Sequence, residues 1–390
     1  MLQLTRRYLR QIDGIFLALC AACSVLSVVT LVSIGHNQLG SINKASVQFI
    51  ASALGILLAL IVSTVDYRAL ARAWPLHAVL AWGMVLPTLL LHNVRLGFLT
   101  VGYDAGGTSN YSWYRVGGMT FQPAELAKIS FVLTLALHLN HVRGRVNKPA
   151  NLLALAVHVL LPVLAIARGV LHYAEQGCNH FIAFKLLALI RDKVFGALRQ
   201  LAAAGGGAAL LLKLRPGLLK GYQAKRIFAV LDPENPALAD IAYQQNKGAM
   251  AIGTGGLTGT GLWGEHVFVP NSWNDFIFSY LANAMGFVGA VTVLLLLLGI
   301  SVRILLAALQ STDALGRYLC VGIFAALFWQ CIINLGMNLQ VLPVIGVTLP
   351  FFSAGGSSVV MVYLCVGLVL AVSRKNRRKK LAVPIELEQV

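Results

Sequence analysis

Apolar stretches long enough to cross a bilayer recur along the whole chain, separated by polar connections. A transmembrane helix needs about 20 mostly apolar residues, and ten stretches approach this length, the sixth being the weakest: 15–34, 47–65, 74–91, 124–139, 152–167, 181–190, 195–212, 276–302, 318–339 and 350–372. The first follows Arg6, Arg7 and Arg10 and is long for a cleaved signal peptide, so we expect a retained signal anchor. The pattern predicts an all-α integral membrane protein with about ten transmembrane helices.

The composition agrees with a chain that lies mostly in lipid. Hydrophobic residues make up 58% of the 390 residues and charged residues 12%, whereas a soluble domain carries roughly 25% charged residues. The mean hydropathy is +0.75. We expect one polytopic membrane domain over residues 1–373 and a basic cytoplasmic tail over residues 374–390.

The placement of the basic residues explains the net charge of +17. Lys and Arg near the ends of membrane spans stay in the cytoplasm. If the N-terminus is cytoplasmic, each inside segment is basic: Arg68 and Arg72; Arg143, Arg145 and Lys148; Arg191, Lys193 and Arg199; Arg303 and Arg317; and the tail from Arg374 to Lys380. Both termini are therefore expected in the cytoplasm. Such segments face anionic membrane lipids, and the tail lacks the interleaved aromatic residues of a nucleic-acid site.

The cysteines and histidines do not indicate a metal or redox site. Most of the six cysteines lie inside apolar runs, and Cys20 and Cys23 have redox-motif spacing but lie within the first span. No two of the nine histidines have convincing ligand spacing on a polar face. We expect helix packing for the cysteines and no metal site.

Two outer stretches are unusually polar. Residues 94–122, between the third and fourth spans, are rich in Gly, Ser, Tyr and Trp. Residues 213–274 form a long extracytoplasmic loop before the eighth span and include a glycine-rich run at 253–264. A loop of that length in a compact domain is usually functional or disordered, and the glycine-rich run has too few charges for a disordered tail.

An ionisable pair opens the fourth span. Pro123 suits the first helical turn, where its missing N–H costs nothing, and Glu125 and Lys128 are three residues apart, so they share one helix face. One interpretation is a carboxylate favoured by the helix dipole, with Lys128 reaching toward the interface. The other is an intramembrane pair that lines a polar cavity. The residues alone leave both open.

Asp275 stands where the long loop meets the eighth span, and the run 276–300 after it contains no charge. A carboxylate in this position is expected at the water boundary, where it can meet a polar substrate. It can act as a general base or help to cap the helix that follows.

A basic cluster in the same loop comprises Lys220, Lys225 and Arg226. Its charges can bind a diphosphate outside the membrane. They can equally lie among the lipid headgroups, and the residues alone do not decide.

Five motifs occur in a fixed order: Phe121-Gln-Pro-Ala-Glu-Leu-Ala-Lys128, Arg226-Ile-Phe-Ala-Val-Leu-Asp-Pro233, the glycine-rich run that begins at Ala251, Asn274-Asp-Phe-Ile-Phe278, and a segment from Asn334 to Ser358. Together they resemble the SEDS family (shape, elongation, division and sporulation), on the RodA side rather than the FtsW side. The resemblance covers nearly the whole chain. It implies ten spans with a large loop before the eighth, in agreement with the charge pattern.

The resemblance implies a peptidoglycan glycosyltransferase that polymerises lipid II at the outer face of the bacterial cytoplasmic membrane. Asp275 occupies the position of the family's essential aspartate and would act as base on the 4-hydroxyl of the acceptor sugar. Lys225 or Arg226 would meet the diphosphate of the undecaprenyl-diphosphate-linked glycan, which asks for positive charge or a divalent cation. The central cavity would be shaped by Glu125, Lys128 and Trp113.

The resemblance also implies a partner and a structural signature. The partner would be a class B penicillin-binding protein, a transpeptidase that cross-links the product. The signature is expected to allow close packing rather than to react: Pro123, Gly253, Gly256, Pro343, Pro350, Ser353, Gly355, Gly356 and Ser357.

Three positions depart from the family pattern. The segment 168–180 keeps no acid of the family's Pro-Asp-Leu-Gly-type motif. Asn283 and Ala284 stand where paired glutamates usually precede a Gly-Phe, and Lys247-Gly248 replaces a Gln-Ser. Two alternatives to the enzyme therefore stay open. One is a transporter that flips lipid-linked precursors with Glu125 and Lys128, and the other is a catalytically inactive scaffold of a cell-wall synthesis complex.

Overall fold

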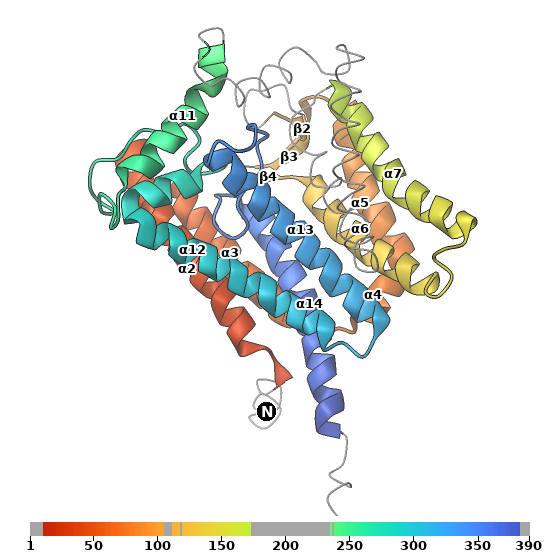
Figure 1. Ribbon diagram of the computed structural model, residues 1–390. Helices are drawn as coiled ribbons and strands as arrows, with labels where there is room; N and C mark the ends of the chain where they lie inside the picture. The colour runs from red at the N-terminus through yellow and green to blue at the C-terminus, as the bar shows by residue number, and fades with distance from the viewer. Residues whose placement is uncertain (1–10, 105–110, 118, 173–234, 236–237, 383–390) are drawn as a thin grey trace, which may run out of the picture.

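The computed structural model describes residues 11–104, 111–117, 119–172, 235 and 238–382 (Figure 1). Most of them are helical. The helices are α2 (Gly14–Ile34), α3 (Asn43–Thr64), α4 (Tyr67–Arg72), α5 (Trp74–Leu90), α6 (Pro123–His141), α7 (Pro149–His172), α11 (Ala239–Thr254), α12 (Ile277–Leu309), α13 (Ala314–Asn338) and α14 (Gly356–Ala382). The predicted helical membrane fold is confirmed.

Within the described residues, five helices are long and apolar enough to cross a membrane: Gly14–Leu39, Asn43–Thr64, Ile277–Leu309, Ala314–Asn338 and Gly356–Arg377. α5, α6 and α7 also begin within a few residues of predicted apolar runs. The predicted spans 181–190 and 195–212 lie outside the described residues. The last span begins later than predicted, because residues 350–355 form a turn rather than helix.

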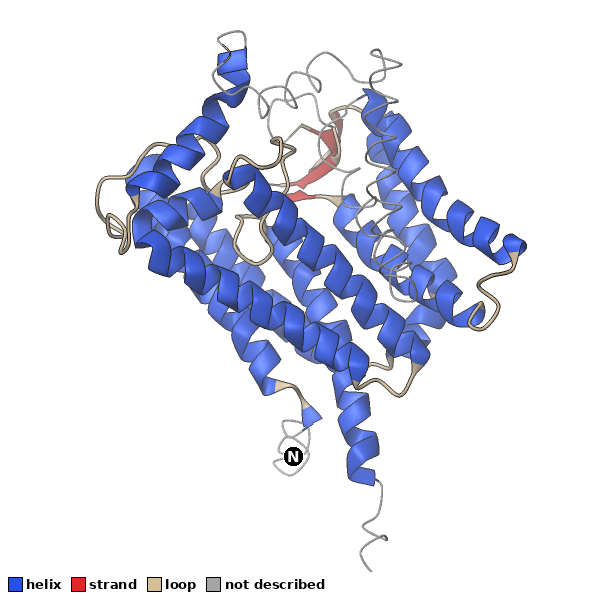
Figure 2. Cartoon of the chain, in the orientation of Figure 1, coloured by secondary structure: helices blue, strands red, loops and turns tan. Residues whose placement is uncertain are grey.

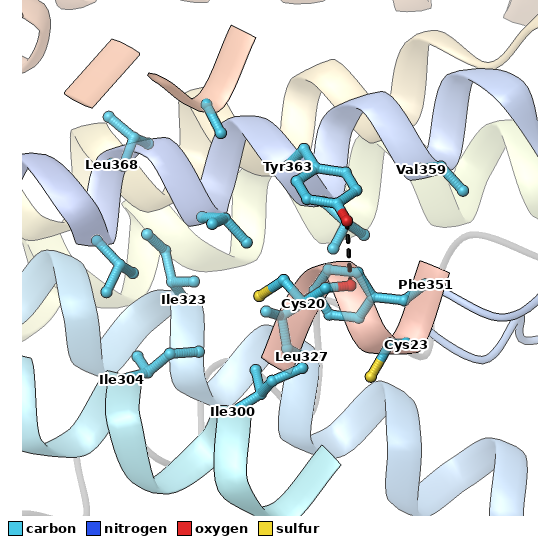
Figure 3. Close-up of a cluster of buried hydrophobic side chains, with 14 of the residues drawn as sticks. Cys20, Cys23, Ile300, Ile304, Ile323, Leu327, Phe351, Val359, Tyr363 and Leu368 are labelled. Carbon is cyan, nitrogen blue, oxygen red and sulfur yellow. Dashed lines mark hydrogen bonds between the residues drawn. The ribbon is translucent and has the colours of Figure 1, made fainter. Parts of the chain in front are cut away.

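α14 packs along α3, and buried side chains of α2, α12, α13 and α14 form a hydrophobic cluster beside this contact (Figure 3). Tyr363 on α14 is fully buried, and its hydroxyl donates to the Cys20 carbonyl at 3.1 Å and lies 2.7 Å from Ser24 Oγ. A side-chain carbon at Gly55 on α3 would lie 2.6 Å from the Tyr363 ring. Small residues let membrane helices approach closely, and Gly55 does so here.

The stretch between α5 and α6 folds into a small antiparallel sheet that the sequence pattern did not reveal. Its strands are β1 (Val94–Leu96), β2 (Leu99–Tyr103), β3 (Trp113–Val116) and β4 (Met119–Phe121), paired in chain order. Figure 2 shows them at the end of the bundle away from the N-terminus. Gly102 has φ +63 and marks a shift in register, and a side chain there would meet the Leu91 carbonyl oxygen at 1.7 Å, so only glycine fits.

The predicted eighth span is broken near its outer end. Gly286 in α12 has φ 65° and ψ −163°, a conformation that only glycine adopts readily. The backbone groups freed by the break bond to the loop after α11. Thr260 and Gly261 N–H donate to the carbonyls of residues 283 and 284, and the N–H groups of residues 287 and 288 donate to those of residues 256 and 257. Irregular backbone near lipid is stable when it is satisfied in this way.

The predicted boundary of a tail at residue 374 falls inside α14, which continues to Ala382. Lys375 pairs with Asp66 at 3.3 Å, and Arg377 donates to the Ile12 carbonyl at 2.6 Å. Arg303 at the inner end of α12 pairs with Asp13. The first basic residues after the last span therefore tie the cytoplasmic ends of the helices together.

Candidate functional site

Asp275 lies in the turn that leads into α12, and its side chain is buried, with the residue 6% exposed. The sequence led us to expect a carboxylate standing at the water boundary, and the structure instead covers it. The expected capping role is not seen either, because the N-cap residue of α12 is Phe276 rather than Asp275. Hydrogen bonds from α13 hold the aspartate through its backbone.

Two asparagines of α13 hold that backbone. The side-chain amides of Asn334 and Asn338 donate to the Asp275 carbonyl at 2.8 and 3.0 Å. Asn338 Oδ1 accepts from the backbone N–H of Ser279 at 3.1 Å and from its hydroxyl at 2.6 Å. Because the asparagines are four residues apart on one helix face, they fix the turn and the first turn of α12 together.

The signature segment, residues 342–358, holds the other side of the same turn. Ser353 Oγ donates to the Asn274 carbonyl at 2.7 Å and accepts from Leu349 N–H at 2.7 Å. Ala354 N–H donates to the Trp273 carbonyl at 2.8 Å. We expected Ser353 to permit helix packing, and the structure gives it these hydrogen bonds to the aspartate turn.

That segment is in turn anchored to α2 and α3. Ser27 Oγ donates to the Phe352 carbonyl at 2.6 Å, and the Gln48 amide donates to the Phe351 carbonyl at 2.9 Å and accepts from Gly355 N–H at 3.3 Å. Phe351 is buried at φ 69°, an uncommon conformation for a bulky residue. These hydrogen bonds offset the conformational free-energy cost of the positive φ at Phe351.

The other signature residues lie around these anchors. A side-chain carbon at Gly356 would lie 3.3 Å from Val47 of α3, which agrees with the expected close packing. Pro343 and Pro350 lie in the irregular segment before α14, and Ser357 lies in the first turn of α14.

Lys44 is a candidate that the sequence did not reveal. It is exposed in the first turn of α3, and its ammonium lies 5.8 Å from the centre of the Trp273 ring, two residues before Asp275. This cation–π contact joins two distant parts of the chain, so no local motif could have indicated it. A lysine beside the aspartate turn can meet an anionic group.

Asn283 connects the broken helix to the glycine-rich loop. Its buried amide donates to the Ala251 carbonyl at 2.9 Å and to Thr254 Oγ1 at 2.8 Å, and its Oδ1 accepts from Val267 N–H at 3.3 Å and lies 3.1 Å from His266 Nδ1. A carboxylate could not donate the first two bonds. Asn283, which stands where the family pattern has a glutamate, is therefore needed as an amide to make these two hydrogen bonds.

The predicted signature glycines of this loop behave differently. Gly253 is in the last turn of α11, with open space around it, and Gly256 follows the helix with φ +56°. The closest approach of this loop to α12 is at Gly255, where a side chain would meet the Ala282 carbonyl at 2.1 Å. The described part of the predicted loop therefore contains a helix, α11, that packs on α12. Gly248 allows this contact, because a side chain there would lie 2.7 Å from Phe276.

Glu125 and Lys128 form an ion pair at 2.7 Å, with side-chain exposures of 14% and 20%. Pro123 begins α6, as predicted, and the helix packs against α13 and α14. The pair therefore faces neighbouring helices. Trp113 pairs with Tyr103 in the sheet and is half-buried.

Lys225 and Arg226 lie outside the described residues, as do residues 173–180 of the atypical segment. Residues 168–172 form the end of α7. The described residues bring together no group of three or more His, Cys, Asp or Glu side chains that could hold a metal ion.

Solved structures share this fold. A peptidoglycan synthase complex, studied for its coordination of polymerisation and crosslinking, contains a chain that matches with a TM-score of 0.73 and 29% identity, over 94% of this chain and 98% of that one. The rod shape determining protein RodA of Thermus thermophilus matches with a TM-score of 0.60 and 28% identity, over 94% and 97% of the two chains.

Sequence comparisons agree. A probable peptidoglycan glycosyltransferase FtsW of Geobacter sp. (strain M18) is 32% identical over 287 residues, covering 71% of this chain and 74% of the relative. Stage V sporulation protein E of Bacillus subtilis (strain 168) is 28% identical, covering 85% and 87%. The cell cycle protein family model of FtsW, RodA and SpoVE matches residues 10–378. The chain therefore belongs to the FtsW/RodA/SpoVE family, the SEDS family.

Proposed function

We propose that this multi-pass protein of the bacterial cytoplasmic membrane polymerises lipid II into glycan strands, with Asp275 as the general base. The observation that carries the proposal is the clamping of the aspartate turn from two sides. Asn334 and Asn338 bind the Asp275 carbonyl, and Ser353 binds the carbonyl of the residue before it. A catalytic group must be held in a defined position to be effective.

The reaction joins two sugars. The Asp275 carboxylate takes the proton from the 4-hydroxyl of the acceptor sugar, and that oxygen attacks the anomeric carbon of the growing chain. The bond from this carbon to the diphosphate oxygen breaks, and undecaprenyl diphosphate leaves. Asp275 then releases the proton to water, which restores the base.

The leaving diphosphate requires positive charge. Lys44 is exposed beside Trp273 and is one source in the described residues. Lys225 and Arg226 remain proposed partners of the same group. Lys128 is paired with Glu125, so we assign that pair to the wall of the cavity, with Trp113, and not to the diphosphate.

The buried position of Asp275 adds a requirement. At 6% exposure, the carboxylate can meet a sugar hydroxyl only in a conformation more open than this one. A transpeptidase of the penicillin-binding class B type is the proposed partner that favours this conformation. The match to a chain of a peptidoglycan synthase complex supports such an assembly.

The test of this function uses the purified protein with its cognate transpeptidase and lipid II. We expect long glycan strands on gels from the mixture, and none when either protein is replaced by buffer. A transporter would move lipid II across vesicles without polymer, and would depend on Glu125 more than on Asp275. A scaffold would bind the transpeptidase and give neither result. Either outcome would contradict the proposal.

A further inference from the structure

The outer sheet has one polar face with two arginines that no step of the proposed reaction uses. Strand pairing aligns Arg95 with Thr100, Thr100 with Arg115, and Arg115 with Thr120, so these four side chains form one row across the sheet. Arg95, Arg115 and Thr120 are exposed. The two arginines lie on β1 and β3, two strand spacings apart, roughly 9–10 Å.

The opposite face is apolar and packed. Val94, Val101, Tyr114 and Phe121 form the neighbouring row. Val101 is buried, and the Tyr114 hydroxyl donates to the Met84 carbonyl of α5 at 2.9 Å. The sheet is therefore fixed on the bundle by one face, and the arginine row points away from it.

Aromatic rings extend the polar face. The shift in register at Gly102 pairs Tyr103 directly with Trp113, and Trp113 is two residues from Arg115 on the same face. The Arg115 guanidinium lies 5.0 Å from the centre of the Tyr103 ring and donates to its hydroxyl at 3.3 Å. Half-buried rings beside exposed arginines form a surface on which a sugar ring can stack while its acidic substituents meet the arginines.

The charges of this face are not neutralised within the described part of the chain. Neither Arg95 nor Arg115 forms an ion pair there. β4 ends at Phe121 and leads through Gln122 into α6, whose first turn contains Glu125. The sheet is therefore continuous with an element assigned to the cavity wall.

We propose that the face formed by Arg95, Thr100, Tyr103, Trp113, Arg115 and Thr120 binds the nascent glycan strand. The ligand class is an acidic amino-sugar polymer whose carboxylates meet the arginines and whose sugar rings stack on Trp113 and Tyr103. This inference rests on the proposed function, because polymerisation at the outer face delivers such a strand beside the sheet. The sheet face holds the product after the sugars are joined.

Binding of preformed product tests this directly. The probe is an end-labelled, uncrosslinked glycan strand with its stem peptides, and the readout is fluorescence anisotropy with the full-length protein in detergent. We expect the double variant Arg95→Gln/Arg115→Gln to raise Kd about tenfold or more, as loss of two charge-assisted contacts implies. The Arg95→Lys/Arg115→Lys variant should retain most of the binding, and added salt should weaken the binding of wild type.

The matched control is Arg143→Gln/Arg145→Gln, two exposed arginines after α6 at its other end, which should bind as wild type does. Unchanged binding by the Arg95→Gln/Arg115→Gln protein would overturn the inference. The inference would also be overturned if the Arg95→Gln/Arg115→Gln change weakened binding to phosphatidylglycerol vesicles but not binding to the glycan strand. Asp275→Asn protein should make polymer about a hundredfold or more slowly and still bind the strand. A wild type that binds the strand but makes no polymer would support the sheet surface and refute the proposed function.

Discussion

Asn334 of α13 donates its side-chain amide to the backbone carbonyl of Asp275 at 2.8 Å, although 59 positions separate the two residues. The same amide donates to the Val347 carbonyl at 2.6 Å, in the segment before α14. One buried side chain thus links the aspartate turn, α13 and the signature segment. The position of the proposed base depends on these links.

Asn334→Leu should lower both activity and stability. The change leaves the Val347 carbonyl without this donor, and a buried unsatisfied polar group costs about 1–3 kcal/mol. We expect a lower unfolding temperature and a loss of polymerisation of about tenfold or more, because small misplacements of a catalytic group are costly. Gln340→Ala, which removes an exposed contact with Asn246, is the control. Equal polymerisation rates for the Asn334→Leu and Gln340→Ala proteins would contradict the role of these hydrogen bonds in holding the aspartate turn.

Ser353→Ala should be harmful, whereas Ser357→Ala should not. The Ser353 hydroxyl hydrogen-bonds the Asn274 carbonyl and the Leu349 N–H. Without the hydroxyl, each of these buried groups lacks this partner, at a cost of about 1–3 kcal/mol each. Ser357 is only half-buried in the first turn of α14. Thermal unfolding and polymerisation rate of the two variants measure the difference. If both serines behaved alike, the hydrogen bonds of Ser353 would not matter.

Asn283→Glu, which restores the residue type of the family pattern, should destabilise this chain. A carboxylate cannot donate to the Ala251 carbonyl or bond Thr254 as the amide does, and its extra length must fit where the residue is 1% exposed. We expect a cost of about 2 kcal/mol or more. Asn246→Glu on the exposed face of α11 is the control. A stabilised Asn283→Glu protein would show that the amide is not required.

Asp313 should contribute stability that depends on pH. Burial raises its pKa, but hydrogen bonds from Arg68 at 2.8 Å and Tyr67 at 2.7 Å outweigh it, so the net pKa lies below the ordinary value. A lowered pKa means that the stabilisation is present above about pH 4 and is lost as the pH falls through the folded pKa. Asp313→Asn should therefore unfold at a lower temperature than wild type at pH 7. The difference should shrink below pH 4, and a constant difference would contradict this pairing.

The helices could be read from the sequence because long apolar runs determine them. α2 begins and ends within one residue of its predicted bounds. The sheet was missed because its strands are three to five residues long, too short for a clear alternation. The break at Gly286 was missed for a different reason. Its backbone is satisfied by a loop that precedes the helix in the chain, and this pairing has no local signal.

The acid of the candidate site could be predicted from the sequence, but the residues that surround it could not. Asp275 was indicated by its place before an uncharged run, but its burial depends on elements far away in the sequence. The roles of Asn338 and Ser353 arise only when α13 and the signature segment fold onto the turn. The contact of Lys44 with Trp273 is of the same kind.

The initial rate of lipid II polymerisation by Asp275→Asn protein with its transpeptidase tests the central claim most directly. Asp240→Asn, a change at an exposed acid in the first turn of α11, is the matched control and should leave the rate as in wild type. Loss of a general base should lower the rate about a hundredfold or more, with the folded protein and transpeptidase binding retained. A rate for Asp275→Asn within a few-fold of the Asp240→Asn control would contradict the assignment of Asp275 as the base.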